Sequence, residues 1–264
     1  MHNFNYHRPS SVEAAAQALS AASDGTLVAG GMTLIPTLKH RLADPTDVVD
    51  LGGVAALRGI SEDGGNVVIG AMTTHAEVAS NATVKSKIPA LATLAESIGD
   101  PQVRNRGTIG GSIANNDPAA DYPAALVGLG ATVRTNKREI AEDNFFTGLF
   151  ETALAEGEVI TAVAFPVPEK AGYAKFPNPA SRYAIVGVMV STGPAGIRVA
   201  VTGAGACVFR DTAMEAALGG GFSAGALDGA SIAADDLNSD IHASAEYRAH
   251  LVGVMARRAV TAAG

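Results

Sequence analysis

The stretch that decides the fold is Thr26-Leu27-Val28-Ala29-Gly30-Gly31-Met32-Thr33-Leu34-Ile35-Pro36. It begins as a short apolar run, which is typical of a strand, and two glycines then interrupt it. The apolar residues Leu34, Ile35, Leu38 and Leu42 follow at a helical spacing. A strand, a glycine turn and a helix in this order point backbone N–H groups at an anion. The stretch therefore predicts a phosphate-binding loop.

A second stretch, Thr108-Ile109-Gly110-Gly111-Ser112, repeats the apolar residues, the paired glycines and the small hydroxyl residue. One glycine pair alone is weak evidence in a chain with 30 glycines. Two such loops could hold the two phosphates of one dinucleotide through their backbone amides. Asp121 follows at the start of an apolar helix, where it is either a helix cap or an acceptor for sugar hydroxyls.

Composition limits the classes of protein that need to be considered. The chain has 264 residues, of which 47% are hydrophobic and 17% are charged, so it can bury one large core or two modest ones. A net charge of -7 argues against a general nucleic-acid binder. No apolar run approaches the ~18 residues of a membrane span, and the first residues lack a signal-peptide core. We expect a cytoplasmic protein that neither binds nucleic acid nor crosses a membrane.

Several kinds of chemistry have no motif in this chain. Cys207 is the single cysteine, which excludes an intrachain disulfide and a cysteine-ligated iron–sulfur cluster. There is no H-E-x-x-H, paired-cysteine or Walker A motif, and Val208 breaks the Rossmann spacing after Gly203-Ala204-Gly205. We interpret each of the six histidines as a surface residue or a satisfied core residue. No metal site and no catalytic acid or base are expected.

The rest of the chain predicts an α+β pattern of short strands and helices. Ser10 and Thr74 are expected to cap helices, because each precedes a glutamate by three residues. Four prolines between Pro166 and Pro179 mark the expected domain junction. The other expected helices are 88–98, 119–129 and 246–262, and the expected strands are 47–51, 66–70, 131–135, 159–165, 183–191 and 197–202.

These motifs, in this order, resemble the medium subunits of the molybdenum hydroxylases, such as carbon monoxide dehydrogenase and bacterial xanthine dehydrogenase. Ala29 to Pro36, followed by Lys39 to Leu42, resembles their first FAD loop, and Arg104 to Ser112 resembles their second. Asp117 to Asp121 and Lys175 to Ala184 resemble two further stretches of these subunits. The resemblance covers essentially the whole chain.

The resemblance implies a two-lobed FAD-binding domain of the vanillyl-alcohol-oxidase (PCMH) type over residues 1–168, with lobes of about 1–52 and 53–168. A small α+β domain of the carbon monoxide dehydrogenase flavoprotein type would follow over 172–264. FAD would bind non-covalently, with Asp121 at the ribityl chain. The residues that the resemblance assigns to FAD are Ala29, Gly30, Gly31, Met32, Thr33, Leu34, Ile98, Thr108, Ile109, Gly110, Gly111, Ser112, Ala114, Asp121, Ile160 and Lys175.

Partners are also implied. Relatives of this kind receive electrons from the [2Fe–2S] clusters of a small subunit, and a molybdopterin cofactor in a large subunit reduces those clusters. We therefore expect an oxidoreductase subunit in a heterohexamer, a dimer of heterotrimers, with an electron acceptor near the flavin. The segment from Gly99 to Arg106 either anchors the backbone through its arginines or faces the iron–sulfur subunit.

Two alternatives belong to other functional classes. A stand-alone flavin oxidoreductase of the same superfamily would need a small-molecule site over the flavin, and no motif marks one. A structural or nucleotide-sensing subunit would have lost its redox role, and the intact glycine loops with Asp121 argue against this.

Overall fold

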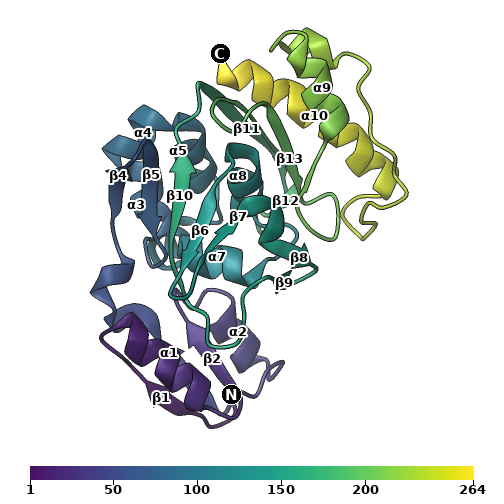
Figure 1. Cartoon of the computed structure of the whole chain (residues 1–264). Coiled ribbons are helices and arrows are strands. Elements are labelled where there is room, and N and C mark those ends of the chain that lie inside the picture. The colour runs from purple at the N-terminus through teal and green to yellow at the C-terminus, as the bar shows by residue number, and fades with distance from the viewer.

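The first lobe contains β1 (Asn5–His7), α1 (Val12–Ala21), β2 (Gly25–Val28), α2 (Leu34–Lys39) and β3 (Asp47–Asp50). The computed structural model describes all 264 residues, and this lobe is the purple part of Figure 1. Its three strands form a parallel sheet in the order β1-β3-β2. Side chains alternate between its faces, so Val28 and Val48 pack with Leu38 of α2, whereas Val49 packs with Ala15 of α1.

The second lobe is an antiparallel sheet with helices packed against it. The strands, in spatial order, are β4 (Ile60–Asp63), β5 (Asn66–Gly70), β10 (Ile160–Pro166), β6 (Thr132–Thr135) and β7 (Glu139–Ala141). The helices are α3 (His75–Ser80), α4 (Ala82–Lys87), α5 (Pro89–Glu96), α6 (Pro101–Arg106), α7 (Ile109–Asn115) and α8 (Tyr122–Leu129). Shorter elements are η1 (Leu51–Gly53), η2 (Ala55–Leu57), η3 (Glu142–Asn144), β8 (Phe146–Gly148) and β9 (Glu151–Thr152).

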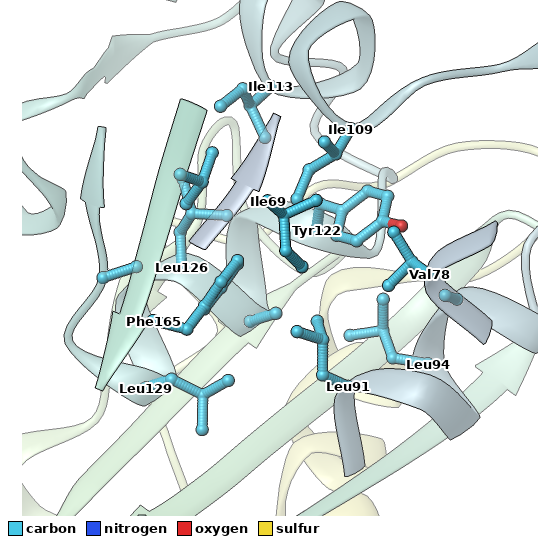
Figure 2. Close-up of a cluster of buried hydrophobic side chains, with 14 of the residues drawn as sticks. Ile69, Val78, Leu91, Leu94, Ile109, Ile113, Tyr122, Leu126, Leu129 and Phe165 are labelled. Atoms are coloured by element: carbon cyan, nitrogen blue, oxygen red, sulfur yellow. The ribbon is translucent and has the colours of Figure 1, made fainter. Parts of the chain in front are cut away.

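The largest hydrophobic core lies between this sheet and its helices. Figure 2 shows Ile69 of β5 and Phe165 of β10 among side chains from α5, α7 and α8. Every residue of α8 is buried, which suits a helix that is apolar on all sides. Such a helix must have a packing partner on each face.

The C-terminal domain supplies the second partner of α8. Its strands β11 (Lys170–Pro177), β12 (Ala184–Thr192), β13 (Arg198–Thr202) and β14 (Phe209–Arg210) form an antiparallel sheet in sequence order. Its helices are α9 (Thr212–Gly219), η4 (Ala224–Leu227) and α10 (Ala245–Ala263). α10 packs on one face of the sheet and α8 on the other. No helix of the structure is both long and apolar enough to cross a membrane.

Strand β12 is therefore covered on both faces. Met189 belongs to the core that contains α8, and Val188 and Val190 belong to the core beneath α10. The hydroxyl of Ser191 donates a hydrogen bond of 2.5 Å to the carbonyl of Gly128 in α8. A Cβ on Gly128 would lie 2.6 Å from Cγ of Met189, so glycine allows the helix to approach the sheet closely. The domain is tightly joined to the second lobe.

The expected α+β fold, with two lobes and a C-terminal domain, is confirmed. Thr74 caps α3 with the expected capping box, but the cap of α1 is Ser11 and not Ser10. The proline-rich segment, expected only as a junction, contains β11. Two of its prolines lie at strand ends, where Pro166 closes β10 and Pro177 closes β11 after a register shift, and the other two lie in the connections between strands. Helix α6 was not among the expected helices.

We predict that Gly172→Ala lowers the free energy of unfolding by about 1–3 kcal/mol, the usual effect of overpacking. A Cβ at Gly172 would overlap the carbonyl oxygen of Ala259, so α10 must move away from β11. Urea unfolding of both the variant and the wild type measures the change. Gly221→Ala is the control, because a Cβ there meets nothing within 4 Å. Equal effects of the two substitutions would contradict this account of the packing.

Candidate functional site

A cavity of about 610 Å³ is lined by residues from both lobes and from the loop between β11 and β12. The first lobe contributes the loop between β2 and α2, which contains the first glycine pair. The second lobe contributes the end of β5, the start of α3 and the start of α7. The segments that the sequence singled out are thus brought to one place, although up to about 150 positions separate them in the chain.

Most of the predicted site residues line this cavity. They are Ala29, Gly30, Gly31, Met32, Thr33, Leu34, Ile98, Thr108, Gly110, Gly111, Ser112, Ala114, Asp121 and Ile160. Ile109 and Lys175 do not line it. The side chain of Ile109 is fully buried in the core of the second lobe, as Figure 2 shows. Lys175 lines a neighbouring cavity of about 390 Å³.

The first loop has unused hydrogen-bond donors. None of the backbone N–H groups from Gly30 to Thr33 donates a hydrogen bond within the chain. Gly31 has a φ of 76°, a conformation that glycine adopts at little cost. Backbone donors that line a cavity without a partner need water or a ligand. This loop can therefore bind an anion through its main chain, as its sequence predicts.

The second loop differs from the expectation, because the amides of Ile109 to Ser112 already donate hydrogen bonds inside the chain. The bonds run from the N–H of Ile109 to Thr73 O (3.1 Å), of Gly110 to Ala71 O (2.9 Å), of Gly111 to Thr108 Oγ1 (3.2 Å), and of Ser112 to Thr108 O (3.0 Å). The bonds from Ile109 and Gly110 fix α7 to the segment between β5 and α3, and the bonds from Gly111 and Ser112 to Thr108 close the first turn of α7. Hydroxyl groups, such as those of Thr108 and Ser112, are what this loop can offer a ligand.

The glycines have a second role, which is to let the two loops touch. A Cβ on Gly30 would overlap the carbonyl oxygen of Arg106 and would lie 2.9 Å from Cα of Gly107. A Cβ on Gly110 would lie 2.6 Å from Cβ of Ala71. A Cβ on Gly111 would lie 3.3 Å from Cβ of Ala29 in the first loop. These contacts allow no side chain, so the shape of the cavity requires glycine at Gly30 and Gly110.

Asp121 precedes α8 but makes no side-chain capping bond to the helix. Its carboxylate accepts one hydrogen bond from the Tyr173 hydroxyl at Oδ1 (2.5 Å) and one from Nζ of Lys175 at Oδ2 (3.1 Å). The side chain is 4% exposed, and this burial raises the pKa of Asp121, while the charge of Lys175 opposes the rise. The capping interpretation is wrong. A carboxylate with two protein partners lies in the cavity wall.

Lys175 joins several parts of the structure. Besides Asp121, its ammonium group donates to the carbonyl of Ser97 (3.0 Å) and to that of Arg182 (2.9 Å). All of its three donors are therefore matched by acceptors in the chain. Its effect on the large cavity is indirect, because it holds Asp121 and the β11–β12 loop in place.

His75 is the functional candidate that the sequence analysis misjudged. It lines the cavity, it is 5% exposed, and its buried Nδ1 has no hydrogen-bond partner. Burial, together with the charge of Arg104, lowers the pKa of His75 to about 4. It is thus neither a surface residue nor a satisfied core residue. Its position just after Thr74, where a helix follows a strand as in the first glycine loop, was the available signal.

Comparison with known proteins gives the family. Residues 2–168 match the FAD binding domain in molybdopterin dehydrogenase, and residues 171–263 match the CO dehydrogenase flavoprotein C-terminal domain. The nicotine 6-hydroxylase medium subunit of Paenarthrobacter nicotinovorans is 38% identical, over 98% of this chain and 96% of its own. The carbon monoxide dehydrogenase medium chain of Hydrogenophaga pseudoflava is 36% identical, over 98% and 96% of the two chains.

Solved structures agree with these relatives. A chain of carbon monoxide dehydrogenase from Hydrogenophaga pseudoflava superposes with a TM-score of 0.90 at 37% identity, covering 99% of this chain and 97% of that chain. Quinoline 2-oxidoreductase from Pseudomonas putida 86 gives a TM-score of 0.85 at 29% identity, with 99% and 96% covered. The free amides of the first loop and the close packing of the glycines suit the diphosphate of FAD. This chain belongs to the FAD-binding medium subunits of the molybdenum hydroxylases.

Proposed function

We propose that this chain holds FAD in the cavity between its two lobes and passes electrons from the [2Fe–2S] clusters of a partner subunit to an external acceptor. The observation that carries the proposal is the run of unpartnered N–H groups from Gly30 to Thr33, which faces the second glycine loop across one cavity. Several donors on one short loop match a doubly charged diphosphate.

The other predicted residues take roles that follow from their places in the wall. Thr108 and Ser112 offer hydroxyls opposite the first loop, and Ile98, Ala114 and Ile160 offer apolar surface to the ring systems. Asp121 accepts hydrogen bonds from the ribityl chain with the lone pairs that Tyr173 and Lys175 leave free. FAD supplies the redox chemistry when bound, and these side chains bind and orient it without a covalent link.

The partners follow from the family. The proposed complex is a dimer of heterotrimers in the cytoplasm, in which a large molybdopterin subunit oxidises the substrate and a small iron–sulfur subunit carries the electrons to this chain. A stand-alone flavin oxidoreductase remains the alternative. Native mass spectrometry of the purified protein distinguishes them, because the proposal requires both partner subunits to copurify.

Helix α6 offers a place where the small subunit can dock. Arg104 is committed within the chain, because its guanidinium donates to the carbonyls of Ile98 and Gly99, both at 3.0 Å. Arg106 is exposed and forms no hydrogen bond or ion pair through its side chain, while its carbonyl touches Gly30 of the first loop. A cation that lies this close to the cofactor loops, and is free to pair, suits an interface with a partner.

We predict that Gly31→Val strongly reduces FAD binding. Valine is strained at a φ of 76°, and the strain changes the direction of the neighbouring amides. The FAD content is measured from the flavin that acid precipitation releases into the supernatant. Gly65→Val is the matched control, because Gly65 has a φ of 83° in the turn between β4 and β5, away from the cavity. A full flavin content in Gly31→Val would contradict the placement of the diphosphate, and colour in the pellet would contradict non-covalent binding.

A second prediction separates the role of Asp121 in binding from its role in the fold. Asp121→Asn should weaken FAD binding by about 1.5–3 kcal/mol, because a charged acceptor is lost from the wall. Tyr173→Phe removes the hydrogen bond to the same carboxylate but does not alter the cavity lining. Flavin fluorescence titration and thermal unfolding of both variants make the comparison. Equal losses of FAD affinity would show that Asp121 acts only through the fold.

Our third prediction for this function concerns docking. Arg106→Glu should leave FAD bound but slow the reduction of the flavin by substrate in the whole complex, because its charge is reversed at the interface. Reduction by dithionite should keep its normal rate. Arg258→Glu, on an exposed position of α10, is the control and should behave as the wild type. Normal substrate-driven reduction in Arg106→Glu would place the docking surface elsewhere.

A further inference from the structure

The ring of His75 is fixed beside the second glycine loop. The backbone N–H of His75 donates a hydrogen bond to the carbonyl of Gly107 (3.0 Å), and Thr74 forms an isolated antiparallel bridge with Thr108. A Cβ on Gly107 would lie 2.5 Å from Nε2 of His75, so the ring lies directly over this glycine. Gly30 of the first loop touches the same residue, since its Cβ would lie 2.9 Å from Cα of Gly107. His75 therefore lies where the two loops meet.

The surroundings of the ring do not satisfy it. Nδ1 of His75 is buried without a partner, and so is the hydroxyl of Tyr122. The two rings are in contact, with centroids 5.3 Å apart and planes inclined at 48°. A buried polar atom without a partner destabilises the fold, and an apolar side chain of similar size would avoid this cost. The ring lines the large cavity, so a partner outside the chain can explain it.

We propose that His75 donates a hydrogen bond from Nε2–H to the diphosphate of FAD, and that the Tyr122 hydroxyl donates to Nδ1 and so fixes this tautomer. The inference rests on the proposed placement of FAD in the cavity. The diphosphate is the part of FAD expected beside Gly107, because the free amides of the first loop lie across the same contact. A bond between Tyr122 and Nδ1, direct or through one buried water, would satisfy both unpartnered atoms.

The protonation states of His75 and Tyr122 are consistent with these two hydrogen bonds. Burial and the positive charge of Arg104 lower the pKa of His75 to about 4, so the apo ring is neutral at pH 8 and has one N–H group. Burial and the neighbouring charge of Asp121 raise the pKa of Tyr122, so its hydroxyl keeps its proton and can donate. The chain therefore supplies a neutral donor that adds to the amides of the first loop.

The test compares three variants of the full chain at pH 8 by fluorescence titration. His75→Leu should weaken FAD binding on the order of tenfold or more, the usual effect of losing a hydrogen bond to a charged group. His75→Gln, which retains an N–H donor, should restore most of the affinity. Riboflavin, which lacks the diphosphate, should bind both variants as it binds the wild type. His250→Leu removes an exposed histidine of α10 and should change neither affinity.

Each outcome decides the question. Wild-type FAD affinity in His75→Leu would overturn the inference, and so would an equal loss of riboflavin affinity. If the wild type itself bound no FAD, the proposed function would fail instead. Long-range ¹H–¹⁵N spectra of the wild type keep the test independent of folding of the variants. The His75 ring should be the Nε2–H tautomer with FAD bound, and Tyr122→Phe should disturb that tautomer. An Nδ1–H tautomer in the FAD complex would contradict the proposal.

Discussion

The contact between Gly30 and the backbone of Arg106 and Gly107 holds the two lobes at the distance that the cavity needs. It can exist only because Gly30 has no side chain. The amides of Ile109 and Gly110 in the second loop are bound to the segment between β5 and α3. The second loop is thereby a fixed wall, and the first loop keeps its donors free. Two stretches with the same sequence pattern thus have different physical roles, one as a binding loop and one as its support.

Elsewhere around the cavity, too, one residue lines the wall and another residue behind it holds it in place. Asp121 lies in the wall, and Tyr173 and Lys175 hold it from the side of the C-terminal domain. His75 lies in the wall, and Tyr122 holds it from the core. Of these two wall residues, His75 is neutral and the charge of Asp121 is paired with that of Lys175. Such an arrangement keeps the cost of burial low until the cofactor arrives with charges of its own.

The sequence predicts the parts of this site that depend on local pattern, and the structure adds the parts that depend on long-range contact. Paired glycines identify both loops, strand-to-helix spacing supports the first of them, and the Thr74 capping box identifies α3. Nothing local shows that Gly110 donates to Ala71, because that bond depends on how α7 meets β5. Asp121 and Lys175 are likewise far apart in sequence, so the capping interpretation could not be rejected before the fold was known. His75 looks ordinary until its burial is measured.

The packing of α8 between the second lobe and the C-terminal sheet has a thermodynamic consequence. Asp121, just before its first residue, lies in the cavity wall, while the helix itself is part of the interface with β12 and β13. The proposed placement of FAD against Asp121 makes cofactor retention and attachment of the C-terminal domain linked equilibria, with the same coupling free energy in both directions. With FAD placed as proposed, loss of the cofactor should loosen the C-terminal domain, and a loosened domain should release the cofactor sooner.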